Sequence, residues 1–119
     1  MTKAWIEKNL EAVRHLRSTY RLALEIMRKK GLRLSRENIV CLTLALCKRR
    51  RLKGYTSRDC PLCAVDRSFC RECPWTLFEG DTCVVKSYRC DSFLKRINRL
   101  NEWEHKLLKM RRTHDQSVD

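Results

Sequence analysis

Residues 2–31, TKAWIEKNLEAVRHLRSTYRLALEIMRKKG, contain the pattern that decides the fold. Their apolar side chains recur at steps of three and four residues, which is the spacing of one face of an α-helix. The members of this stripe are Ile6, Leu10, Val13, Leu16, Tyr20, Leu24 and Met27. Thr2 is a suitable N-cap, and Gly31 is typical of the position after a last helical turn. The sequence therefore predicts a helix of about 28 residues, roughly 42 Å long.

Two further helices are expected, one on each side of the middle of the chain. Ser35 offers an N-cap for a second helix, and residues 39–47 are apolar except for Thr43. Such a helix should be buried on most sides, and a buried strand is the alternative for the same stretch. A third helix begins near Asp91 or Ser92, and its apolar stripe comprises Phe93, Ile97, Leu100, Trp103, Leu107 and Met110. We predict a mainly α fold, a small helical bundle.

The length of 119 residues, with 43% apolar side chains, fits a single domain over 1–119. We divide it into a helical hairpin (1–50), a basic linker with a Cys-rich zinc module (51–91), a C-terminal helix (92–113) and a tail (114–119). The sequence has no uncharged apolar run of about 18 residues and no signal-peptide pattern at its start. We therefore expect a cytoplasmic protein that does not span a membrane.

Six of the eight cysteines lie between residues 60 and 90, in a block that is the most specific motif of the chain. The candidate metal ligands are Cys60, Cys63, Cys70, Cys73, Cys83 and Cys90. Cytosolic thiols stay reduced, so this spacing favours metal coordination over disulfide bonds. Four thiolates form a closed tetrahedral Zn²⁺ site, which stabilises a fold and leaves no open position for catalysis. Cys41 and Cys47 are instead interpreted as small core residues of the second helix.

The spacing leaves open which four cysteines bind one ion. Two Cys-x2-Cys pairs allow tight turns that aim both sulfurs at the same metal. Cys60, Cys63 and Cys73 belong to both quartets that we consider, and either Cys70 or Cys83 is the fourth ligand. An iron–sulfur cluster is the alternative cofactor, although the closely spaced cysteines of ferredoxins are absent.

Parts of this block resemble known families. Cys60-x2-Cys63-x6-Cys70 is similar to the first half of the fungal binuclear zinc cluster, in which six cysteines hold two ions, but the nine residues after Cys73 depart from that pattern. The block also resembles a set of short uncharacterised bacterial and phage proteins that carry CPLC, then CxxCP, then a Gly followed by Cys. The matching residues are Cys60 to Cys63, Cys70 to Pro74, Gly80 and Cys83. This resemblance implies a metal-bound core and no particular activity.

The chain carries 27 Lys and Arg against 14 Asp and Glu, a formal net charge of +13. This excess favours polyanionic partners, nucleic acid foremost. The densest basic run is residues 48–58, and its candidate nucleic-acid contacts are Lys48, Arg49, Arg50, Arg51, Lys53, Tyr55 and Arg58. Five further cations are expected to extend the same face: Lys86, Arg89, Lys95, Arg96 and Arg99.

The sequence shows no arrangement of residues typical of catalysis. The histidines are isolated from one another, and we expect His15 and His105 to lie on solvated helix faces. We therefore predict that the protein is not an enzyme but a small zinc-stabilised binding protein, which binds nucleic acid through its basic patch. The alternative is a protein-interaction module, a small regulator or inhibitor, which binds an acidic partner or forms a homodimer through Trp5, Trp103 and the second helix.

Overall fold

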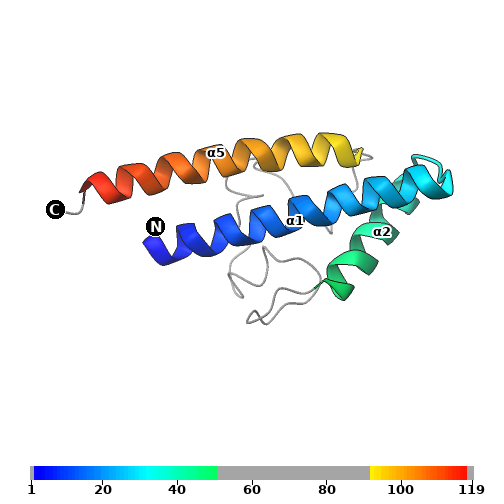
Figure 1. Ribbon diagram of the computed structural model, residues 1–119, viewed down its shortest axis with the longest axis horizontal. Coiled ribbons are helices and arrows are strands. Elements are labelled where there is room, and N and C mark those ends of the chain that lie inside the picture. The colour runs from blue at the N-terminus through cyan, green and yellow to red at the C-terminus, as the bar shows by residue number, and fades with distance from the viewer. Residues whose placement is uncertain (1, 51–91, 118–119) are drawn as a thin grey trace.

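The structure, a computed structural model, describes residues 2–50 and 92–117. This part of the chain contains three helices, α1 (Lys3–Lys30), α2 (Arg36–Arg49) and α5 (Phe93–Ser117), and no strand. Helix α5 runs antiparallel beside α1, and α2 lies against the C-terminal half of α1 (Figure 1). The prediction of a mainly helical protein is confirmed for these residues, while the predicted Cys-rich insert lies outside them.

Both ends of α1 are capped as the sequence predicts. The Thr2 hydroxyl accepts a hydrogen bond from the Trp5 backbone N–H at 3.1 Å. Gly31 adopts the left-handed conformation, with φ of 59°, which a residue without a Cβ reaches at little cost. The Leu32 N–H then bonds the Met27 carbonyl at 2.9 Å, as in a Schellman motif. These caps fix a helix of 28 residues between two sharp ends.

Helix α2 begins where predicted and ends at Arg49, inside the basic run 48–58. The Ser35 hydroxyl accepts from the Asn38 N–H at 3.2 Å, and the Asn38 side chain donates to the Arg33 carbonyl at 2.8 Å. Its last turn contains Lys48 and Arg49, the first two residues of that run. Basic side chains in a last turn interact favourably with the negative end of the helix dipole, so the charge run prolongs the helix and does not end it.

The burial of α2 is more one-sided than expected. Ile39, Leu46 and Cys47 are buried, which confirms Cys47 as a core residue. Cys41 is exposed, so its assignment to the core was wrong. A helix that packs one face against its neighbours buries residues spaced three and four apart, and Cys41 lies off that face. None of the described helices is both long enough and apolar enough to cross a lipid bilayer.

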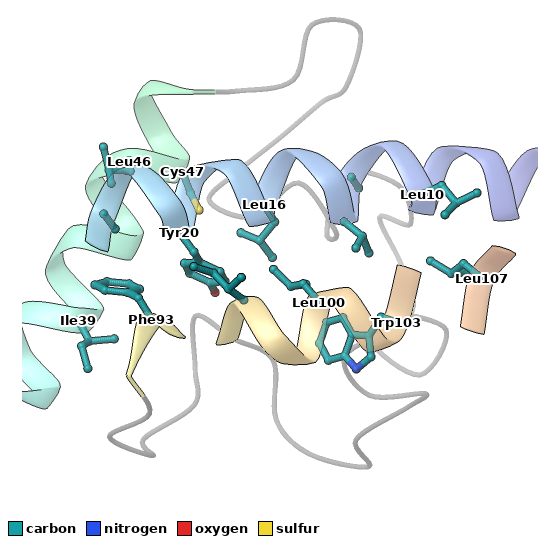
Figure 2. Close-up of a cluster of buried hydrophobic side chains, with 14 of the residues drawn as sticks. Leu10, Leu16, Tyr20, Ile39, Leu46, Cys47, Phe93, Leu100, Trp103 and Leu107 are labelled. Atoms are coloured by element: carbon teal, nitrogen blue, oxygen red, sulfur yellow. The ribbon is translucent and has the colours of Figure 1, made fainter. Parts of the chain in front are cut away.

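The apolar core follows the seam between α1 and α5 and extends to α2 (Figure 2). Along the seam, Trp103 and Leu100 of α5 face Leu16 of α1, and all three side chains are fully buried. Beside α2, the rings of Tyr20 and Phe93 stack at a tilt with their centroids 5.7 Å apart. Each large buried side chain stabilises the fold by about 1.5–3 kcal/mol relative to an exposed one.

Two polar residues, Asn9 and Thr19, are buried in α1. Asn9 is 1% exposed. Its side-chain N–H donates to the Trp5 carbonyl at 2.9 Å, while its Oδ1 has no hydrogen-bond partner among the described residues. This half-satisfied amide is a local cost within the buried face of α1, where the Thr19 hydroxyl by contrast both donates and accepts.

Helix α5 runs to Ser117, past the predicted end at residue 113 and into the predicted tail. The Thr113 hydroxyl donates to the Lys109 carbonyl at 3.0 Å. Asp115 forms an ion pair with Lys3 at 3.2 Å. The ion pair shows that the last turns of α5 lie beside the start of α1, although their sequence is polar.

Candidate nucleic-acid interface

Positive charge is concentrated at one end of the helical part. The described residues contain twenty Lys and Arg against seven Asp and Glu, so they account for a net +13. We divide them into the paired end (residues 2–20 and 101–117) and the basic end (residues 21–50 and 92–100). The paired end has eight cations and five acids, whereas the basic end has twelve cations and only two acids. The net charges of the two ends are therefore +3 and +10.

At the paired end, acids on each helix meet cations on the other. The ion pairs are Lys3–Asp115 at 3.2 Å, Arg111–Glu7 at 3.2 Å, Arg14–Glu104 at 2.6 Å and Arg17–Glu104 at 2.7 Å. All of them join α1 to α5, so the charges of this end hold the two helices in one antiparallel register.

Glu104 is the strongest point of this network. The hydrogen bond from Arg17 lowers its pKa most, and that from Arg14 lowers it further, against the opposing effect of burial, to about 2 from the ordinary 4.5. Arg17 also donates to Asn101 Oδ1 at 3.0 Å. The carboxylate is therefore ionised at neutral pH and accepts hydrogen bonds from both Arg14 and Arg17.

The basic end presents eight exposed cations. They are Arg21, Arg28, Lys29, Lys30, Arg33, Lys48, Arg49 and Lys95. Lys29 pairs with Glu25 at 3.0 Å, but the two side chains are 75% and 57% exposed, so this pair contributes little. The other seven have no ion-pair partner among the described residues, and their charges face solvent.

Three of the seven predicted nucleic-acid contacts lie in the described part. Lys48 and Arg49 are exposed in the last turn of α2, while Arg50, the C-cap, is half-buried. The other four predicted contacts lie outside the described residues: Arg51, Lys53, Tyr55 and Arg58. The run KRR at 48–50 thus divides into two side chains that face solvent and one that turns inward.

Arg50 is held by a set of contacts that we name the Arg50 latch. Its guanidinium donates to the hydroxyls of Thr19 at 2.7 Å and Ser18 at 3.0 Å. Both hydroxyls in turn donate to the His15 carbonyl, at 3.0 and 2.8 Å. The His15 ring Nε2–H donates to the Arg50 carbonyl, so the expectation that His15 lies on a solvated face was wrong. The latch joins the end of α2 to the middle of α1.

Arg96 does not extend the basic face as expected. It is 1% exposed, donates to the Tyr20 hydroxyl at 3.1 Å, and lies with its guanidinium carbon 5.6 Å from the centre of the Tyr20 ring. Its position explains this, because it follows Phe93 by three residues and precedes Leu100 by four, which places it on the buried stripe. Sequence periodicity could have identified it. Lys86 and Arg89 lie outside the described residues.

The predicted metal ligands cannot be placed in this site. All six lie outside the described residues: Cys60, Cys63, Cys70, Cys73, Cys83 and Cys90. Within residues 2–50 and 92–117, no three His, Cys, Asp or Glu side chains come together as a metal site. The zinc centre therefore stays a prediction for residues 51–91.

The basic end also exposes apolar side chains, which sequence periodicity missed. The large apolar residues exposed in the described part are Leu32 (38%), Leu34 (58%) and Leu94 (53%). All three belong to the basic end. Leu32 and Leu34 lie in the connection between α1 and α2, outside any helical stripe, where a pattern of spacing carries no information.

The chain has no match among protein-family models, curated proteins or solved structures. The charges, burial and contacts of its own residues are therefore the observations that bear on its function. Of these, the charge difference between the two ends is the largest feature.

Proposed function

We propose that the protein binds nucleic acid through its basic end, as a binding protein and not as an enzyme. The observation that carries this proposal is the ratio of twelve cations to two acids at that end, with one of the acids already paired to Lys29. Acids within the basic end cannot neutralise these charges. A polyanion can, and the phosphate backbone of a DNA duplex carries about one negative charge per 1.7 Å of its axis.

The physical basis of binding would be counterion release. Each phosphate that a Lys or Arg neutralises frees counterions, so affinity falls steeply with salt and depends little on base sequence. Lys48 and Arg49 are central to this surface because they share one helical turn and point away from the core.

Two matched variants test the proposal. One replaces Arg33, Lys48 and Arg49 by Gln at the basic end, and the other replaces Lys8, Lys109 and Arg112 by Gln at the paired end. Each removes three exposed charges, so the net charge is the same in both. Affinity for a 20-base-pair DNA duplex is measured by fluorescence anisotropy between 50 and 200 mM salt.

We expect the basic-end variant to lose more than tenfold in affinity and about two to three units of salt slope, since each phosphate contact contributes about 0.9. The paired-end variant should bind within a few-fold of the wild type. Equal losses in both variants, or no binding by the wild type, would contradict the proposal.

The proposal includes a structural Zn²⁺ held by four of the six cysteines at 60–90, in the reducing cytoplasm, with an iron–sulfur cluster as the alternative. Its support is the spacing of these cysteines. Such an ion can add on the order of 10 kcal/mol to folding. Elemental analysis of the purified protein should find zinc, and Cys63→Ser should lower its content and the melting temperature. A metal-free protein with an unchanged melting curve would reject the ion.

A second candidate function is the binding of an acidic protein segment, and one observation favours it. The three exposed leucines all lie among the cations of the basic end, whereas phosphate recognition needs no exposed leucine. A homodimer through this end is disfavoured because it would bring two +10 surfaces together. Leu32→Ser with Leu34→Ser should leave DNA affinity unchanged if nucleic acid is the ligand. A loss of affinity for a Glu- and Leu-containing helical peptide, with poly-glutamate binding unaffected, would instead favour the acidic segment.

A further inference from the structure

We infer that Arg50 is a positioning residue of the proposed interface and not one of its phosphate contacts. It fixes the last turn of α2 on α1 and so sets where Lys48 and Arg49 meet the nucleic acid. This inference rests on the proposed function for its consequence, but the latch itself can be tested without nucleic acid.

The first argument is the geometry of the Arg50 side chain. A guanidinium is a rigid fork whose donors can engage two acceptors at once. Here it engages the Thr19 and Ser18 hydroxyls at 2.7 and 3.0 Å, on neighbouring residues of α1. Because both hydroxyls spend their own protons on the His15 carbonyl, their lone pairs are left to accept from Arg50.

The second argument is that the contact is reciprocal. The last carbonyls of a helix have no partner within the helix and need one from elsewhere. The His15 ring supplies this partner for the Arg50 carbonyl. In return, the Arg50 guanidinium donates to the two hydroxyls that themselves donate to the His15 carbonyl. Side chain and backbone of both residues take part, so a move of Arg50 toward a phosphate would break contacts on both helices.

The third argument concerns what the latch holds. The Arg50 N–H bonds the Leu46 carbonyl at 2.8 Å, which closes the turn that carries Lys48 and Arg49. Helix ends fray unless something fixes them. Two exposed cations on a fixed backbone lose less conformational freedom on binding than two on a frayed end. The expected benefit of the latch is therefore affinity without an added contact.

Three variants separate positioning from contact. Arg50→Lys keeps the charge but loses the fork, and Ser18→Ala with Thr19→Val removes both acceptors without changing any charge. Lys48→Gln is the reference for a lost phosphate contact. DNA affinity is measured for each between 50 and 200 mM salt. We expect the two latch variants to lose about three- to tenfold in affinity with the salt slope unchanged, whereas Lys48→Gln should reduce the slope by about 0.9.

A fourth variant, Arg50→Gln, removes the charge as well as the fork. The inference is overturned if Arg50→Lys binds like the wild type while Arg50→Gln reduces the salt slope as Lys48→Gln does. It is also overturned if the Ser18→Ala, Thr19→Val variant keeps full affinity. Amide hydrogen exchange gives a readout independent of nucleic acid, since the Arg50 N–H should exchange about tenfold faster in both latch variants while amides in the middle of α5 are unchanged. Wild-type protein that fails to bind DNA refutes the proposed function, whereas unchanged exchange at Arg50 refutes the latch.

Discussion

The two ends of the α1–α5 pair use their charges in opposite ways. At the paired end, Glu7, Glu104 and Asp115 each meet a cation on the other helix. At the basic end, acids are nearly absent and most cations face solvent. Both ends contain fully buried apolar side chains, so they differ in the charges on their surfaces and not in the burial of their cores.

Helix α2 accounts for this difference. Beside it, Tyr20, Phe93 and Ile39 pack together from three helices, and Figure 2 shows these side chains converging. A core made from three helices fixes much of the arrangement by apolar packing, and the Arg50 latch adds polar contacts at the end of α2. At the paired end, cross-helix ion pairs also favour one alignment of α5 along α1. The comparison teaches that the exposed cations of the basic end are not needed to hold its helices together, which leaves them available for the binding that we propose.

The largest effect should come from removing a core ring at the basic end. Phe93→Ala should lower the free energy of unfolding by about 3–5 kcal/mol, because it leaves a cavity beside Tyr20 and the α2 face. The neighbouring Leu94→Ala is the control, since Leu94 is 53% exposed, and it should cost less than about 0.5 kcal/mol. Urea unfolding measures both. Similar losses for the two variants would mean that this end is not held by its core.

The next effect concerns the charge network of the paired end. Glu104→Gln should cost about 1–2 kcal/mol at pH 7, a value reduced for partial solvent exposure. Because the folded pKa is about 2 and the ordinary value is 4.5, this stability is present above about pH 4.5 and is lost as the pH falls toward 2.

The difference in the free energy of unfolding between wild type and Glu104→Gln, measured in urea, should therefore shrink as the pH is lowered from 5 to 2.5. Glu102→Gln is the control on the same helix, because Glu102 is exposed and has no ion-pair partner among the described residues. A difference in the free energy of unfolding that stays constant with pH would show that Glu104 contributes through packing and not through its charge.

The smallest effect should follow from removing cations at the basic end. Arg21→Gln with Arg28→Gln should change the free energy of unfolding by less than about 0.5 kcal/mol, since neither side chain has an ion-pair partner in the described part. Arg17→Gln is the comparison at the paired end: it removes only one cation but should cost about 1 kcal/mol through Glu104. Equal losses in the free energy of unfolding at both ends would show that the cations of the two ends contribute equally to stability, which contradicts the comparison.

Most of the helical framework could be predicted from the sequence because its signals are local. Thr2, Gly31 and Ser35 act through contacts with residues a few positions away, and each has the predicted role. The extension of α5 to Ser117 could not be predicted in this way. These last turns lie beside the start of α1, where Asp115 meets Lys3 from more than a hundred residues earlier in the chain, and a local pattern carries no information about that contact.

The site was less predictable, because exposure depends on what lies opposite a residue in space. Charge composition identified Lys48 and Arg49, which are exposed, but it could not distinguish Arg50, whose partners are on another helix. The inward position of Arg96 could have been read from its spacing to Phe93 and Leu100. The concentration of charge at one end required the antiparallel arrangement of α1 and α5.

Asn9 has a consequence for engineering. Its amide is confined in the apolar face of α1 with one of its polar atoms unmatched in the described part, a deficit of about 1–3 kcal/mol. A residue of similar volume without polar atoms would remove this deficit. Asn9 is thus one identifiable position at which the natural chain is less stable than it could be, and it lies far from the surface that we propose for binding. A stabilised version for laboratory use could begin with this residue.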